Sequence, residues 1–192
     1  MREKEIKITF LNVPFPFIFC TSFEDLNLEP NSIDHMFCRW SLAWVQNPNK
    51  IIGKIKKFLK QGGKMVFHEY YDWSTHQIFP FNENIDKCIK TALKSFKESD
   101  FEIDIGAALP QLLYDMDFNI ISTRLMPKLA KPGSKEWNWP KTFYYNYFPR
   151  LVKMGYLNNN DTKEFFEDFK SLEILPYSRI FCPILIEIIA EK

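Results

Sequence analysis

Residues 31–70 read NSIDHMFCRWSLAWVQNPNKIIGKIKKFLKQGGKMVFHEY and hold the clearest structural pattern of the chain. The run from Ile33 to Trp40 predicts a buried strand behind an Asn-Ser turn. Apolar residues then recur at helical spacing from Pro48 to about residue 60, with lysines on the other face, and Gly62-Gly63 follows. The apolar stretch 64–70 predicts a second buried strand. Strand, helix, glycine turn and strand together indicate one βαβ unit of a parallel sheet.

The rest of the chain continues the α/β pattern. Residues 131–146 are rich in Pro, Trp and Tyr without a clear period, which predicts an irregular segment that exposes Trp137 and Trp139. Asp161, followed by Glu164 three residues later, predicts a capping box. Pro183 favours an edge position or a bulge in the last strand. The further predicted elements are strands over 17–20, 118–126 and 180–190 and helices over 85–96, 105–115, 148–154 and 162–172.

Composition and charge limit the class of protein. The 192 residues are 46% hydrophobic and 26% charged, which is typical of one globular domain spanning 1–192. Lys and Arg total 25 against 24 Asp and Glu, so the net charge of +1 provides no field that would attract nucleic acid or an anionic membrane. We therefore expect neither of these as a partner.

Cysteine, histidine and the N-terminal sequence indicate the compartment. Four cysteines lie far apart without a CxxC pair, which favours reduced, buried thiols. The three histidines show no metal-ligand spacing, so we expect no metal site. The apolar stretch 8–20 is broken by Asn12, Pro14 and Pro16, which argues against a signal peptide or a membrane span. A cytoplasmic location is the resulting expectation.

The carboxyl ends of the predicted strands are the natural place for a ligand site. In open α/β sheets, ligands bind where parallel strands end. Polar and aromatic residues stand there at 21–23, 39–40 and 69–71, and the chain has five tryptophans. These aromatic side chains either form flat walls of a pocket for an amphipathic ligand or fill the core.

The residues from Asn31 to Pro48, followed by Leu59-Lys60-Gln61-Gly62-Gly63, resemble the middle of class I S-adenosylmethionine-dependent methyltransferases, the methyltransferase type 11-like domain. Asp34, the Asn47-Pro48 helix start and the LKQGG turn stand at matching intervals. Residues 105–121 are similar to the segment before the sixth strand of that family, and the last strand is similar to its reversed seventh. The resemblance implies an α/β, Rossmann-like sheet with helices on both faces and an antiparallel C-terminal strand.

The same resemblance implies a set of site residues, with S-adenosylmethionine as cofactor. Cysteine, arginine and tryptophan after the fourth strand would lie near its methionine and sulfonium, and Ser22 stands where the family usually has an acidic residue at the adenine edge. The implied cofactor-binding residues are Ser22, Phe23, Cys38, Arg39 and Trp40. The candidate bases are His68 and Glu69. The implied acceptor-binding residues, some in a lid or insertion over 131–160, are Tyr71, Trp73, Trp139, Tyr144, Tyr147 and Arg150.

One part of the family pattern is missing. No Gly-x-Gly-x-Gly motif occurs in the sequence, and residues 1–16 are too few for the first strand, its helix and the second strand. We therefore predict an incomplete domain whose N-terminal βαβ unit is missing or degenerate, with weak or absent cofactor binding by this chain alone.

Two functions follow as hypotheses. The first is methyl transfer by in-line displacement to a small-molecule or protein acceptor, which asks mainly for positioning and exclusion of water. The second is a non-catalytic methyltransferase-like subunit, with a protein partner that covers the sheet edge left by the missing unit. A dinucleotide oxidoreductase is the weaker third reading, because no phosphate-binding glycine loop is present.

Overall fold

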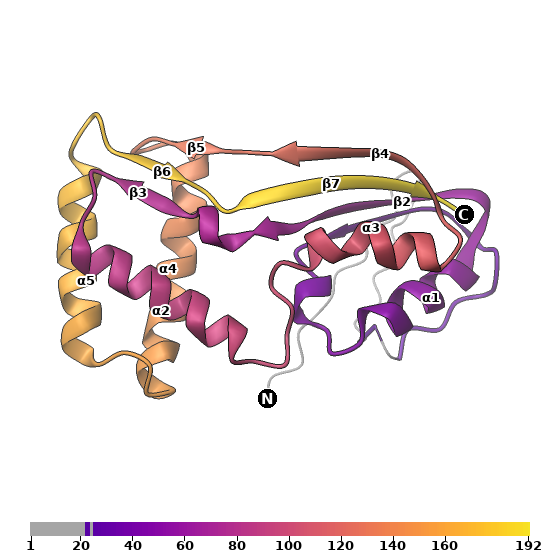
Figure 1. Cartoon of the computed structure of the whole chain (residues 1–192), viewed down its shortest axis with the longest axis horizontal. Coiled ribbons are helices and arrows are strands. Elements are labelled where there is room, and N and C mark those ends of the chain that lie inside the picture. Colours follow the sequence, from indigo (N-terminus) through magenta and orange to yellow (C-terminus); the bar gives the residue numbers. More distant parts are fainter. Residues whose placement is uncertain (1–21, 24) are drawn as a thin grey trace, which may run out of the picture.

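The computed structural model describes residues 22, 23 and 25–192. Two sheets run along one side of the molecule, and the helices lie beneath them (Figure 1). Each sheet has its own group of buried side chains, so the chain holds two adjoining cores. The mixed α/β class predicted from the sequence is confirmed.

The main sheet has the strand order β1-β2-β7-β4. Its strands are β1 (Ile33–Arg39), β2 (Leu59–Asp72), β7 (Ile184–Glu191) and β4 (Asn119–Met126). β1 and β2 are parallel, whereas β7 lies antiparallel between β2 and β4. The βαβ unit predicted over 31–70 and the reversed last strand are both confirmed.

Two helices cover one face of the main sheet. α1 (Pro48–Phe58) joins β1 to β2, and α3 (Ile105–Asp115) precedes β4. Their buried residues share one core with β2 and β7. The predicted end of the first helix near residue 60 is slightly wrong, because Leu59 already leaves the helix and pairs with Ile33 as the first residue of β2.

Gly106, in the first turn of α3, allows this helix to approach the sheet closely. A Cβ at this position would lie 2.6 Å from the carbonyl oxygen of Tyr70 and 2.7 Å from Cγ2 of Ile186. We expect Gly106→Ala to lower the free energy of unfolding in urea by about 2 kcal/mol, because the helix must move away from the sheet. Gly53→Ala is the matched control, since nothing lies within 4 Å of its Cβ position. Equal stabilities of the two variants would contradict the prediction.

The small sheet has the order β3-β6-β5 and is antiparallel throughout. Its strands are β3 (Gln77–Phe79), β6 (Arg179–Phe181) and β5 (Leu129–Ala130). The single strand predicted over 180–190 is therefore wrong, because the chain passes from β6 to β7 through Pro183. Proline has no N–H to donate to a neighbouring strand. Pro183 accordingly lies in the short connection between β6 of the small sheet and β7 of the main sheet, and not at an edge or within a strand.

Three helices pack over the small sheet around the second core: α2 (Glu83–Lys97), α4 (Lys135–Lys153) and α5 (Asn159–Glu173). The irregular segment predicted over 131–146 is wrong, because α4 includes most of it and continues through Pro140 and Pro149. The two helices predicted over 148–154 and 162–172 correspond to the end of α4 and to α5.

Aromatic packing explains why α4 tolerates its two prolines. Trp137, expected to be exposed, is fully buried and stacks on Phe169 of α5 with ring centroids 5.5 Å apart. Phe148, further along the same helix, packs against Phe165 with ring centroids 4.5 Å apart. A proline inside a helix costs about 3 kcal/mol, and each buried aromatic side chain contributes about 1.5–3 kcal/mol, so the several buried rings of α4 together offset its two prolines.

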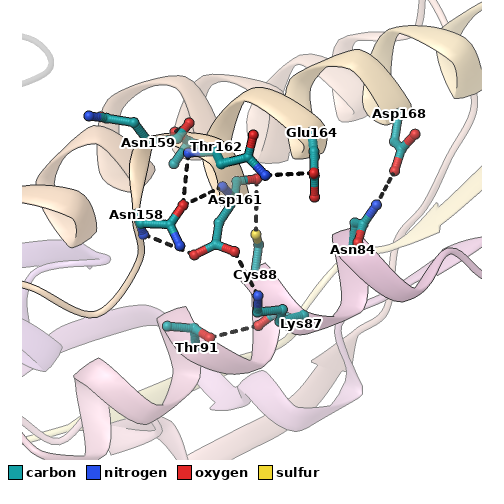
Figure 2. A network of polar contacts seen from close by, with 11 residues as sticks. Asn84, Lys87, Cys88, Thr91, Asn158, Asn159, Asp161, Thr162, Glu164 and Asp168 are labelled. Carbon is teal, nitrogen blue, oxygen red and sulfur yellow. Dashed lines mark hydrogen bonds and ion pairs between the residues drawn. The ribbon is translucent and has the colours of Figure 1, made fainter.

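A polar network joins α2 to α5 (Figure 2). Lys87 Nζ lies 2.6 Å from Asp161 Oδ1, and Asn84 donates to Asp168. Asp161 belongs to a capping box, but with Asn158 as the N-cap residue, so the box predicted for Asp161 and Glu164 is displaced by three residues. The carboxylate of Asp161 therefore serves both as a helix cap and as the partner of a neighbouring helix.

The face of the main sheet opposite α1 and α3 is partly open within the described chain. Phe37 on β1 is 59% exposed, and β1 pairs on one side only, with β2, among the described strands. The strand predicted over 17–20 lies outside the described residues. No helix in the described part of the chain is long and apolar enough to cross a membrane.

Candidate functional site

The turn after β1 is built on the carboxylate of Glu69. β1 ends at Arg39, and Trp40 adopts a left-handed backbone conformation with φ of +52°. The turn directs the backbone N–H groups of Ser41 and Leu42 at Glu69 Oε1, at 3.0 and 3.2 Å. A bulky residue rarely adopts a positive φ, so the surrounding contacts hold this conformation.

Glu69 is completely buried at the end of β2. Burial raises the pKa of its carboxyl group, although the hydrogen bonds from Ser41 and Leu42 oppose that shift. Oε1 also accepts from the Cys38 thiol at 3.5 Å, whereas Oε2 has no partner among the described residues. A buried carboxylate oxygen without a partner is costly, so this position favours a polar group that can donate to it.

Three aromatic rings meet beside this turn. Trp40 stacks on Trp139 of α4 with centroids 5.0 Å apart, and on Tyr70 of β2 at 6.0 Å. The guanidinium of Arg39 lies 4.0 Å from the centre of the Trp40 ring, and Trp73 continues the cluster 5.4 Å from Tyr70. The indole N–H groups of Trp40 and Trp73 are buried without a hydrogen-bond partner in the described chain. Aromatic faces and unpaired polar atoms thus gather where β1 and β2 end.

The two candidate bases lie on opposite faces of the sheet, as consecutive strand residues must. His68 turns away from the aromatic cluster, and its Nε2 lies 2.8 Å from Glu187 Oε2. Glu187 in turn accepts from Arg124. His68 and Glu69 therefore cannot act on the same group, and Glu69 alone belongs to the strand-end site.

Cys38 lies beneath the turn as a buried thiol. Its pKa is raised well above the ordinary value, first by burial and then by the nearby charge of Glu69. A thiol in this state is not a nucleophile at neutral pH.

Ser22 and Phe23, expected near the adenine edge, form a local turn. Ser22 Oγ donates to Asp25 at 2.8 Å, and Phe23 belongs to the first core. Ser22 therefore already has an acidic partner three residues away.

The remaining predicted residues spread along α4 and its neighbours. Trp139 and Trp73 join the strand-end cluster, and Tyr71 is 39% exposed. Tyr144 is buried in the second core, and Tyr147 hydrogen-bonds Ser95 of α2. Arg150 is exposed, about 16 Å along α4 from Trp139 at 1.5 Å per residue. The structure thus brings together six of the predicted residues at the strand ends: Cys38, Arg39, Trp40, Glu69, Trp73 and Trp139.

Two further groups were not among the implied site residues, although Tyr70 stands in the strand-end stretch 69–71. Tyr70 shares the stack with Trp40, and its position at the end of the predicted strand was the signal for it. His76 is buried between the small sheet and α4, and its Nε2 lies 2.5 Å from the hydroxyl of Tyr144. A single histidine in a short loop carries no sequence pattern that would place it there. Across the described residues, no cluster of His, Cys, Asp or Glu is arranged to hold a metal ion.

Comparison with known proteins supports the resemblance. The sequence model of the methyltransferase domain family matches residues 3–67. No curated protein matches the chain. Among solved structures, a putative methyltransferase from Bacillus halodurans C-125 is 11% identical with a TM-score of 0.53, over 90% of this chain and 75% of that chain.

A second solved structure is phosphoethanolamine N-methyltransferase 2 of Haemonchus contortus, in complex with phosphomonomethylethanolamine and S-adenosylhomocysteine. It is 15% identical with a TM-score of 0.44, over 89% of this chain but only 36% of that chain. At these identities the likeness concerns the fold. The family-model match at residues 3–67 supports the resemblance seen in residues 31–66, and the fold of the chain is similar to that of the Bacillus halodurans protein.

Proposed function

We propose that the chain takes part in S-adenosylmethionine-dependent methyl transfer to a small-molecule or protein acceptor. The observation that carries the proposal is the turn held by Glu69, which presents Arg39 and Trp40 where β1 and β2 end. Ligands of open α/β sheets bind at this edge. Arg39 and Trp40 also lie inside the segment that matches the methyltransferase family.

The residues at the strand ends fit the methionine part of the cofactor. S-adenosylmethionine, when bound, supplies a methyl group activated by a sulfonium. The rings of Trp40 and Tyr70 offer faces for a cation, worth about 0.5–2 kcal/mol. Glu69 Oε2 and the Trp40 N–H are unpaired but fully covered, so they can serve as acceptor and donor only when the side chains over them move. A sulfonium on Trp40 needs Arg39 or Trp139 to move, because both pack on that ring. We assign Ser22, Phe23 and Cys38 to the same site as part of this proposal.

We assign binding of the methyl acceptor to Tyr71, Trp73 and Trp139. Residues 131–160 form a lid or insertion in this proposal and contribute Tyr144, Tyr147 and Arg150. Trp139 links the acceptor-binding residues to the proposed cofactor site, because it lies on α4 and stacks on Trp40. In-line displacement asks the protein to align donor and acceptor and to exclude water. Within this proposal Glu69 is a positioning residue that holds the turn, and His68 stays outside the reaction.

Titration of the purified chain with S-adenosylmethionine tests the proposal. We expect saturable but weak binding, with a dissociation constant of roughly 0.1 mM or more, since the sequence has no Gly-x-Gly-x-Gly motif. Trp40→Ala should weaken binding by about 2- to 30-fold, the range given by loss of one cation–π contact. Tyr114→Ala is the control, because Tyr114 is 74% exposed on α3. Low-micromolar binding would contradict the expectation of an incomplete cofactor site.

The second candidate function is that of a methyltransferase-like subunit without catalysis. It is favoured by the outer edge of β1, which has no strand partner in the described chain, and by the exposed ring of Phe37 beside it. An open edge with an apolar neighbour suits pairing with a strand of a partner protein. No measurable binding of S-adenosylmethionine by the folded chain would favour this function over the first.

A further inference from the structure

Arg39 lies over the aromatic ring that the proposed cofactor site offers to a cation. The central carbon of its guanidinium is 4.0 Å from the centre of the Trp40 ring, where a cation from solvent would lie. Arginine stacks on aromatic faces as well as pairing with anions. The chain therefore already supplies one cation to this ring, and a sulfonium has to compete with it.

Of the two groups packed on Trp40, Arg39 is the one that can move more easily. Its side chain is exposed, and no ion pair within the described part of the chain includes it. Trp139 stacks on both Trp40 and Tyr70, with ring centroids 5.0 and 6.3 Å apart. Trp137, two positions earlier on α4, is fully buried. The helix thus holds the Trp139 ring in place, whereas the exposed guanidinium is free to turn away.

A displaced Arg39 stays near the ring, because it directly precedes Trp40 in the chain. Its guanidinium then presents planar N–H groups, whose geometry matches a carboxylate. A ligand with a cationic group and a carboxylate on one short chain can therefore engage both residues. The methionine end of S-adenosylmethionine has this arrangement, since its sulfonium and its carboxylate are separated by three carbons.

We propose that Arg39 determines specificity at this site: it lies on Trp40 as an internal cation without ligand, and it pairs with the carboxylate of a ligand whose sulfonium takes its place on the ring. The inference rests on the proposed function, because it assigns the methionine end of the cofactor to these two residues. A cation without a carboxylate is disfavoured, since it displaces Arg39 from the ring and offers it no partner.

Two small sulfonium ions test the proposal: trimethylsulfonium, which has no carboxylate, and dimethylsulfoniopropionate, which has one. Binding to the whole chain is followed by NMR titration at neutral pH and constant ionic strength. Contacts from the methyl protons of the probe to the Trp40 ring identify the site. We expect dimethylsulfoniopropionate to bind about 2- to 5-fold more tightly than trimethylsulfonium, the range of one exposed ion pair.

Arg39→Gln should remove this preference. Trimethylsulfonium should bind about 2- to 5-fold more tightly to this variant than to the unchanged chain, because the ring no longer carries a competing cation. Dimethylsulfoniopropionate should change little, because it gains the free ring and loses the ion pair. Arg124→Gln is the matched control. It removes the same charge from an exposed arginine on β4 that pairs with Glu187, and it should leave the binding of both probes unchanged.

Three results would overturn the proposal: no contact of either probe with Trp40, an unchanged affinity of Arg39→Gln for trimethylsulfonium, or an equal gain in Arg124→Gln. A folding defect would weaken both probes, so tighter binding of one probe cannot come from a damaged structure. Titration with S-adenosylmethionine separates this inference from the proposed function. If the cofactor does not bind and the probes behave as expected, the role of Arg39 stands and the proposed function fails. If the cofactor binds and Arg39→Gln leaves trimethylsulfonium unchanged, the inference alone fails.

Discussion

Glu69→Ala is expected to lower the free energy of unfolding by about 3 kcal/mol, because it leaves two backbone N–H groups at the end of β1 without an acceptor. Leu42, which supplies one of them, is 1% exposed, so water cannot easily replace the carboxylate. Glu69→Gln keeps an oxygen in the same place and removes the buried charge. It should therefore stay within about 1 kcal/mol of the unchanged chain.

Urea unfolding of the three chains at neutral pH measures these differences. Glu167→Ala is the matched control, since Glu167 is exposed on α5. Surface substitutions of this kind stay within about 0.5 kcal/mol. A Glu69→Ala chain as stable as this control would show that the turn does not depend on the carboxylate.

The same pair of variants separates two roles of Glu69 in methyl transfer. A positioning residue that only accepts hydrogen bonds from Ser41 and Leu42 can be replaced by glutamine with most of its effect intact. A general base cannot, because an amide does not take up a proton. Retained methyl transfer by Glu69→Gln, but not by Glu69→Ala, is the result that the geometry favours, whereas loss of methyl transfer in both variants would indicate a general base.

The unit from β1 to β2 could be predicted because its signals are local. Apolar spacing between Pro48 and Phe58, a proline at the start and glycines after the end each act within a few residues. The ends of β1 and β2 follow from the same pattern. Arg39, Trp40 and Glu69 could therefore be placed at the strand ends before their contacts were known.

α4 could not be predicted, because its stability is a long-range property. Its prolines and aromatic residues argue against a helix when only neighbours in sequence are considered. The stacking of Trp137 on Phe169 joins residues that are 32 positions apart. The hydrogen bond from the backbone N–H of Ser41 to Glu69 likewise depends on the positive φ of Trp40. This conformation could not be predicted, because the position carries a tryptophan and not a glycine.

His76 illustrates the same limit and gives a measurable pH dependence. Its Nδ1 lies 3.0 Å from the carbonyl oxygen of Phe181, so it carries the proton and donates. Nε2 then accepts from the Tyr144 hydroxyl. Burial lowers the pKa of His76 from 6.5 to about 4, because the charged ring would lose its hydration.

Folding stability should therefore fall as the pH drops from about 7 to 4. In this pH range His76 becomes protonated in the unfolded chain but stays neutral in the folded chain, so the free energy of unfolding rises with pH. The difference between the pKa values of 6.5 and about 4 corresponds to about 3 kcal/mol of folding stability.

Urea unfolding at a series of pH values should show this loss in the unchanged chain and in His35→Gln, since His35 is exposed. His76→Gln should lose less stability between the same pH values by that amount, whatever its stability at pH 7, because its amide does not titrate. Equal losses in the two variants would mean that His76 takes up its proton equally well in the folded and the unfolded chain, and that its position between Phe181 and Tyr144 does not exclude the charged form.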